Sequence, residues 1–315
     1  IEFQLNASII NKRDFSWAAS FNTSFNRVRV TSLGTFLDFY LRNSGWGFSN
    51  TPSDYIVREG DLLGSMWGFE TEGMYSINDF TYNAGTGTYT LNGGVPDNSS
   101  FTSAVPAPGR LKFKDQNKDG QITEDDKKVI GVAQPKVFGG LNQQIRYKNF
   151  DLSIFVNFQL GAKVYNANKL EFTNGYQPNA NMLSIMNDRW RTIDENGQVV
   201  TDPVQLAALN ANAKLWIPST ASTSFLLHSW AIESGDFLRI NNITLGYNLP
   251  SSLLKKMKLR QLRAYFTVNN VAVITGYSGY DPEVSTRRGT PETPGVDYSA
   301  YPRSRSFIFG LNLSL

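Results

Sequence analysis

The sequence predicts an all-β fold whose antiparallel strands cross a membrane as part of a barrel, with short helices in long loops. Seven segments alternate apolar and polar residues, and this period of two is typical of a strand with two different faces. The connections between these segments are alternately short and very long, as in transmembrane barrels. The last segment runs to the C-terminus, so it ends on the side of the short turns.

The strands are expected where the alternation is regular. In the first segment Ile1, Phe3 and Leu5 share one face, while Glu2 and Gln4 share the other. Later segments repeat this arrangement, with Asn, Ser, Gln and Thr on the polar face. The seven expected strands, in chain order, are residues 1–9, 15–25, 137–147, 152–160, 243–249, 262–268 and 307–315.

The connections distinguish two architectures that share this alternation. In a soluble sandwich the apolar faces look inward, whereas in a membrane barrel they look outward to lipid. Three connections are short or compact, namely NKRD, KN and PSSLLKKMKLR. The other three, residues 31–136, 165–235 and 275–303, far exceed the roughly 15 residues beyond which loops are uncommon in compact domains. We therefore expect a barrel in which these three segments are extracellular loops.

The long loops carry local patterns of their own. Residues 64–76 are rich in aromatic residues and glycine, which predicts an ordered hairpin. Residues 181–191 and 203–214 have apolar residues at helical spacing, so we expect short helices outside the membrane.

The composition limits the function classes. Hydrophobic residues make up 41% and charged residues 18% of the chain, and its net charge of +3 includes no long run of Lys or Arg. Charge therefore gives no support to nucleic-acid binding. The chain has no Cys, which excludes disulfides and thiol chemistry. No stretch approaches the roughly 18 consecutive apolar residues of a transmembrane helix, and the mean hydropathy of −0.30 by itself suggests a soluble protein.

One segment, DQNKDGQITEDD at residues 115–126, matches the calcium-loop pattern D-x-[DN]-x-[DN]-G. Such a loop takes oxygen ligands at positions 1, 3, 5, 7, 9 and 12, with a glycine at position 6 for the sharp turn. Calcium is favoured over magnesium because the ligands are many and all oxygen. The alternative is an Asx-rich turn without a metal. The predicted ligands are Asp115, Asn117, Asp119, Gln121, Thr123 and Asp126.

The flanks of this loop argue against a calcium sensor. A sensor needs two flanking helices that open on binding, but GRLKFK and KKVIG are not amphipathic helices. We therefore expect a structural cation that braces a long loop, with Ile122 tethering the loop to apolar neighbours.

Catalytic chemistry has little support. The only histidine, His228, has no assignable nucleophile or orienting acid, so we interpret it as a histidine of a loop or rim. Glycoside hydrolysis requires two carboxylates at a set distance from each other. The sequence does not give this distance for the acid pairs Asp125–Asp126 and Glu70–Glu72. We predict that the protein is not an enzyme. The loop aromatics, among them Trp46 and Trp216, are open to two interpretations, namely loop packing and contact with a sugar substrate.

Four long stretches carry a family resemblance in collinear order: EGDLLGSMWGFETEGMYS, the run from GRLKFKDQNKDG to GAKVYN, DFLRINNITLGYNLP, and the closing FIFGLNLSL. They resemble the C-terminal part of SusC/RagA-type TonB-dependent receptors of the Gram-negative outer membrane. The resemblance implies a 22-stranded barrel with an N-terminal plug, of which residues 1–315 would supply the C-terminal segment without the plug.

The resemblance also implies a function and partners. Such a receptor would import oligosaccharides or peptides with a SusD-like surface lipoprotein, would sit in outer-membrane lipid, and would be energised by the TonB complex through the missing N-terminal part. The alternative from the residues alone is a soluble or surface β-domain with a calcium-braced loop that acts as a glycan-binding module. A hydrolase is the weakest of the three hypotheses.

Overall fold

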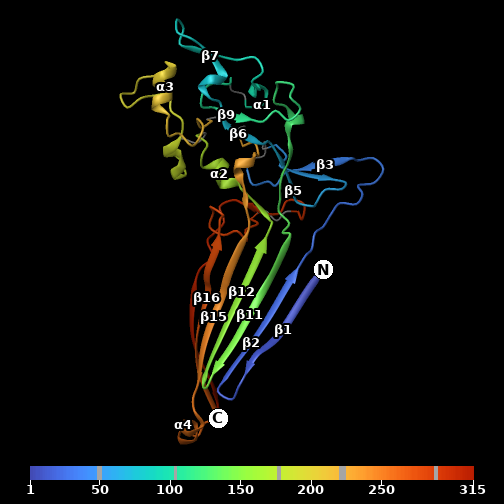
Figure 1. The fold of residues 1–315 in the computed structure, drawn as a ribbon, viewed down its shortest axis with the longest axis vertical. Helices are drawn as coiled ribbons and strands as arrows, with labels where there is room; N and C mark the ends of the chain where they lie inside the picture. The colour runs from blue at the N-terminus through green and yellow to red at the C-terminus, as the bar shows by residue number, and fades with distance from the viewer. Residues whose placement is uncertain (48–51, 103–104, 176–178, 220–224, 287–289) are drawn as a thin grey trace.

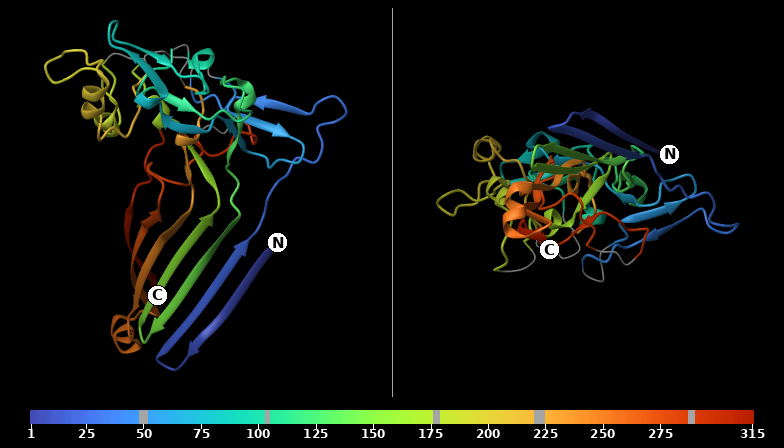
Figure 2. Two further views of the ribbon diagram at one scale, coloured as in Figure 1. Left: turned by 45° about the horizontal axis from the view of Figure 1, so that its top comes forward. Right: turned by 90° about the horizontal axis from the view of Figure 1, so that it is seen from below.

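The computed structural model describes residues 1–47, 52–102, 105–175, 179–219, 225–286 and 290–315. It consists of a long, curved sheet of seven strands with a body of smaller elements beyond one end (Figures 1 and 2). We call the long sheet the wall. We call the connections at residues 25–136, 161–236 and 276–305 together the cap.

The wall is formed by all seven predicted segments. Its strands pair antiparallel with their chain neighbours, in sequence order across the sheet. They are β1 (Glu2–Asn11), β2 (Phe15–Ser24), β11 (Val137–Tyr147), β12 (Phe150–Leu160), β15 (Phe237–Asn248), β16 (Gln261–Thr275) and β18 (Ser306–Ser314).

Two strands are longer than the alternation predicted. β15 begins six residues before the expected Ile243, and β16 ends well after Val268. The physical reason is a β-bulge, because the register between these strands shifts between Ile240 and Asn242. An extra residue reverses which face the following side chains occupy, so the regular alternation does not extend through it.

The register aligns apolar residues in one row across the wall, one from each strand. A second row, on the opposite face, is polar except for Phe155. The apolar row is Ile10, Trp17, Ile145, Leu152, Leu245, Phe266 and Phe309, and the second row is Asn6, Ser20, Asn142, Phe155, Asn242, Asn269 and Ser306. The two-faced sheet that the sequence predicted is therefore confirmed.

The described residues of the cap form four small sheets. The largest has the order β10 (Lys128–Val132), β5 (Ser65–Gly68), β4 (Tyr55–Arg58), β3 (Phe39–Arg42), and another has the order β14 (Ile232–Ser234), β13 (Lys163–Asn166), β17 (Val296–Asp297). Two further pairs are β6 (Thr71–Met74) with β9 (Leu111–Phe113), and β7 (Phe80–Asn83) with β8 (Thr88–Leu91).

The helices of the cap are short. The α-helices are α1 (Ser99–Thr102), α2 (Ala167–Glu171) and α3 (Pro203–Leu209), and the 3-10 helices are η1 (Ile77–Asp79), η2 (Glu124–Asp126), η3 (Ser184–Asp188) and η5 (Ser229–Ala231). α3 begins at Pro203 because Asp202 caps it by accepting hydrogen bonds from the N–H groups of Val204 and Gln205. η3 and α3 lie within the two predicted helical stretches.

The hairpin predicted for residues 64–76 is wrong. β5 and β6 fall inside this segment but do not pair with each other. β5 pairs with β4 and β10, and β6 pairs with β9. The segment is instead a link between two sheets, because strands from elsewhere in the long loop supply its partners.

The apolar core lies in the cap. Among the described residues, three clusters of buried apolar side chains are present, and none of them draws on the seven wall strands. The largest brings Trp46, Tyr165 and Phe225, from separate parts of the chain, into edge-to-face contact. The long connections therefore form one packed body and not separate loose loops.

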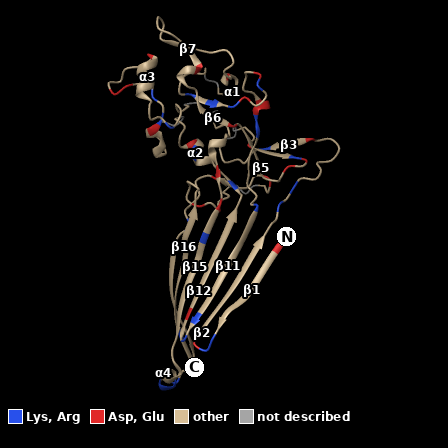
Figure 3. Cartoon of the chain, in the orientation of Figure 1, with Lys and Arg blue, Asp and Glu red and all other residues tan. Residues whose placement is uncertain are grey.

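The other end of the wall carries the short connections. These are residues 12–14, residues 148–149 and the segment that contains α4 (Ser251–Met257). The basic residues near α4 lie at this end, far from the cap (Figure 3). No helix among the described residues is long and apolar enough to span a bilayer.

Candidate functional site

The predicted cation loop lies between β9 and β10, as its sequence flanks indicated. Ile122, in the middle of the loop, is fully buried and packs with Phe69, Phe113 and Leu226. The expectation that Ile122 tethers the loop to apolar neighbours is confirmed.

The loop is closed by its own hydrogen bonds. The Asp115 carboxylate accepts from the N–H groups of Lys118, at 2.6 Å, and Gly120, at 2.8 Å. Asp119 accepts from the N–H of Gln121 at 2.8 Å, and Asn117 accepts from the N–H of Asp119 at 3.0 Å. Gly120 has a φ of 85°, a left-handed conformation that a residue with a side chain adopts only with strain.

The last predicted ligand, Asp126, is turned toward the backbone. It is fully buried, and its two carboxylate oxygens accept from the N–H groups of Gln116, at 2.7 Å, and Thr123, at 2.8 Å. Among the described residues, no three His, Asp or Glu side chains converge in a way that could hold a metal ion. The donor chemistry of the loop fits calcium, but its carboxylates do not converge on a common point, and calcium stays a prediction.

The acidic residues Glu70 and Glu72, which the sequence offered as a catalytic pair, both contact lysine side chains. Glu70 forms ion pairs with Lys114, at 3.6 Å, and with Lys128. The hydrogen bond from Lys128 lowers the pKa of Glu70, so Glu70 is not suited to act as a general acid. Glu72 lies 3.9 Å from Lys112. These contacts give hydrolysis no support.

His228 lies in the loop of residues 165–235, as interpreted, but it is buried within the cap and not at its rim. It is 2% exposed, and its ring lies 5.4 Å from that of Trp216 and 5.8 Å from that of Phe113. Burial, and secondarily the charge of Lys169, lowers its pKa to about 3. The imidazole is therefore neutral at physiological pH.

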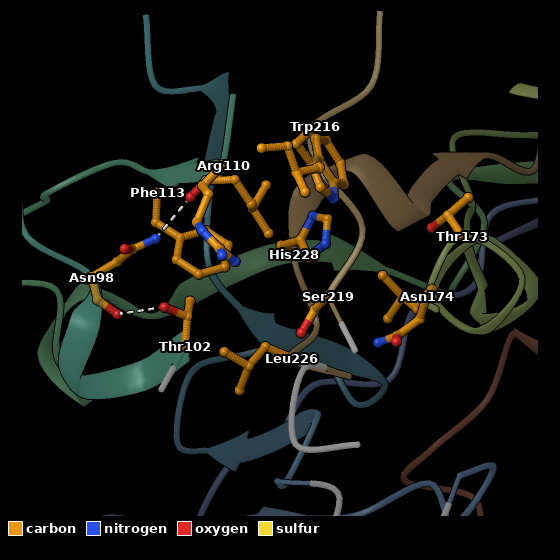
Figure 4. Close-up of a pocket in the computed structure, with 13 residues that line it drawn as sticks. Asn98, Thr102, Arg110, Phe113, Thr173, Asn174, Trp216, Ser219, Leu226 and His228 are labelled. Carbon is orange, nitrogen blue, oxygen red and sulfur yellow. Dashed lines mark hydrogen bonds between the residues drawn. The ribbon is translucent and has the colours of Figure 1, made fainter. Parts of the chain in front are cut away.

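His228 lines a cavity of about 60 Å³ between β9, α2 and the segments around Trp216 and Leu226 (Figure 4). Its Nδ1 is buried without a hydrogen-bond partner. Arg110, held by a backbone hydrogen bond from its N–H to the Ala107 carbonyl, extends its guanidinium into the same space. Sequence reasoning missed this cavity because its walls come from three distant segments, none of which carries a motif.

Most of the loop aromatics have a packing role. Trp46, Phe69, Tyr75 and Trp216 are all buried. Of the two interpretations, loop packing therefore holds for these four residues.

A buried ion cluster ties the cap to the polar face of the wall. Arg239 of β15 is 2% exposed and contacts Asp281 at 2.7 Å and Glu283 at 2.8 Å. Arg303 contacts the same two carboxylates at 3.0 and 3.2 Å. The signal that could have found it is an arginine inside a strand whose other residues are apolar or neutral.

A second ion pair crosses the polar face near the short turns. Asp151 of β12 pairs with Arg263 of β16 at 2.5 Å, over the intervening β15. A Cβ at Gly246 of β15 would lie 2.4 Å from the Arg263 guanidinium, so a side chain there would displace this pair from its present position.

Relatives and solved structures match the chain over its whole length. It is 31% identical to TonB-dependent receptor P3 of Formosa agariphila over 99% of this chain and 28% of that protein. It is 27% identical to TonB-dependent receptor SusC of Bacteroides thetaiotaomicron, over 99% of this chain and 26% of that protein. The RagAB peptide transporter structure matches with a TM-score of 0.67 at 20% identity, over 100% of this chain and 29% of that one. No family model matches.

These matches and the two-faced wall define the class of protein as a TonB-dependent receptor, of which this chain contributes part of a barrel. The chain spans less than a third of the length of the curated relatives it matches. Within that class it belongs to the SusC/RagA family.

Proposed function

We propose that the chain is part of an outer-membrane receptor of a Gram-negative bacterium that imports oligosaccharides or peptides, driven by TonB. The observation that supports this most strongly is the apolar row across the wall, which no buried cluster of the described residues covers. A soluble module would bury such a row in a core. The cap would then face the outside of the cell, where substrate arrives.

Transport breaks no bond of the substrate. Substrate would bind between the cap and a SusD-like lipoprotein, and TonB would then displace a plug supplied by the rest of the polypeptide. The named receptors among the relatives support this proposal, and the RagAB peptide transporter is a precedent for peptides.

The test uses the complete receptor in its host. Deletion of its gene should abolish uptake of one member of a panel of labelled oligosaccharides and peptides, and a protonophore should abolish the same uptake in the wild type. Affinity purification of the tagged receptor should recover a lipoprotein in equal amount. Uptake that survives deletion and the protonophore would contradict the import function, and recovery of the receptor alone would contradict the lipoprotein partner.

We also propose that calcium binds the loop of residues 115–126 as a structural ion. Oxygen donors at the expected spacing and the left-handed Gly120 support the proposal. The predicted ligands are those named above, and the ion would add a link between β9 and β10. Equilibrium dialysis with radioactive calcium tests it directly, because Asp115→Ala and Asp119→Ala together should remove one bound ion.

A further inference from the structure

The cavity beside His228 has the chemistry of a ligand site. Its apolar walls include Phe113, Trp216 and Leu226. Its polar lining is neutral apart from Arg110, and consists of Asn98, Thr102, Thr173, Asn174, Ser219 and His228. Because a water needs only about 10–15 Å³ of such volume, a cavity of about 60 Å³ has room for a group of a few heavy atoms.

The charge of this cavity is unbalanced. Arg110 is half-buried, and no ion pair among the described residues includes it. The residues that line the cavity include no Asp or Glu, and His228 adds no charge because it is neutral. A half-buried guanidinium without a carboxylate among its neighbours favours an anion.

The geometry points to a carboxylate-binding site at this cavity, with Arg110 as the cation that holds the carboxylate. An arginine presents two parallel N–H groups that match the two oxygens of a carboxylate. The His228 ring, which makes no hydrogen bond to a described residue, provides one further N–H donor. The rings of Trp216 and Phe113 line the site, and apolar surroundings of this kind strengthen each of these contacts.

The carboxylate has two possible sources, a free small acid and an acidic group on the transported oligomer. Only the second rests on the proposed import function. A calorimetric titration of the complete receptor in detergent separates the two sources. The ligands are sodium acetate, sodium galacturonate and a trigalacturonate, and galactose and sodium chloride are the controls. A trigalacturonate affinity at least tenfold above that of acetate assigns the oligomer as the source, and equal affinities assign a free acid.

The variants test the role of Arg110. Arg110→Gln should weaken acid binding at least tenfold, and Arg110→Lys should weaken it less because the charge remains. Arg191→Gln is the matched control, since Arg191 is an exposed arginine of the same cap that does not line the cavity. Intrinsic tryptophan fluorescence checks that each variant keeps the cap folded.

Two outcomes would overturn the proposal. One is that no acid shows saturable binding, so that the acids give the same titration as the galactose and sodium chloride controls. The other is an Arg110→Gln receptor that folds and binds acids like the wild type. Neither outcome bears on TonB-driven uptake, which is measured separately in cells.

Discussion

The wall and the cap belong to one chain, but they place their apolar side chains in opposite surroundings. In the cap Tyr55, Met66 and Phe69 have no exposed surface, whereas in the wall Phe309 is 81% exposed and Leu311 is 72% exposed. The cap follows the rule of a globular domain, in which burial of apolar area drives folding. The wall follows a different rule, in which the strands pair completely and the apolar face needs an apolar solvent.

The backbone of the wall fits that second rule. Every strand between β1 and β18 pairs on both sides, so its N–H and C=O groups have partners within the sheet. Lipid offers no hydrogen bonds, and an unpaired group in it costs several kcal/mol. The ion cluster around Arg239 joins the two regions on the polar face, where charges are tolerated.

The largest expected effect is on the cap alone. Trp46→Ala should destabilise the cap by about 3–5 kcal/mol, because it leaves a cavity and removes the hydrogen bond from the Trp46 indole to the Tyr165 hydroxyl. Hydrogen exchange should show faster exchange in β13 and unchanged exchange in β11 and β12. Tyr301→Ala, at a 91% exposed tyrosine, is the control. Equal loss of protection in wall and cap would show that the two are one cooperative unit.

The next effect is on the wall alone. Ile154→Arg places a charge on the apolar face and should cost about 2–4 kcal/mol near the middle of a bilayer. Ser153→Arg, one residue earlier, places the same charge on the polar face and should cost less than about 1 kcal/mol. Refolding into lipid vesicles with a urea titration measures both. Equal costs for the two variants would remove the distinction between the faces.

A third effect is a pH dependence of the cap. Asp54 is buried, and burial raises its pKa from 3.8 to about 6, although Ser44 donates two hydrogen bonds to it. The folded state therefore binds more protons than the unfolded state between these values, so stability falls as pH rises through this window. The loss should be about 2 kcal/mol between pH 4 and pH 6.

Asp54→Asn is the variant that tests this pH dependence, because an amide does not titrate. Thermal unfolding of the cap at several pH values should show the slope in the wild type and not in the variant. A slope that persists in Asp54→Asn would assign the pH dependence to another group.

The smallest expected effect is that of calcium. At ten times its dissociation constant, one bound ion should stabilise the cap by about 1.4 kcal/mol. Limited proteolysis near the loop with and without EDTA measures it, and the Asp115→Ala and Asp119→Ala double variant should not respond. An equal response of wild type and variant would show that the effect does not come from this loop.

The wall could be predicted from the sequence because the signal for its strands, the alternation of apolar and polar residues, lies in neighbouring residues. Alternation such as Leu152, Ser153, Ile154 fixes the face of each residue without knowledge of the partner strand. The β15 and β16 bounds were missed at the bulge near Ile240 and Asn242, where the local rule is interrupted.

The cap could be predicted only in fragments. The strands on either side of the cation loop, the tether at Ile122 and the helix at Pro203 have local signals. The pairing of β5 with β10 does not, because its partners are separated by a long stretch of chain. The cavity beside His228 could not be predicted for the same reason, since Arg110, Asn174 and Trp216 are distant in the sequence and meet only after the cap has packed.

The central claim is that the apolar face of the wall lies against lipid. Residues 1–315 contain no cysteine. In the complete receptor, with any cysteine outside these residues replaced by serine, single cysteines along β12 can each carry a spin label. In lipid vesicles, labels at Leu152, Ile154 and Val156 should collide with dissolved oxygen, and labels at Ser153 and Asn157 with a polar nickel complex. Collision rates without this period of two, or with the two faces exchanged, would contradict the claim.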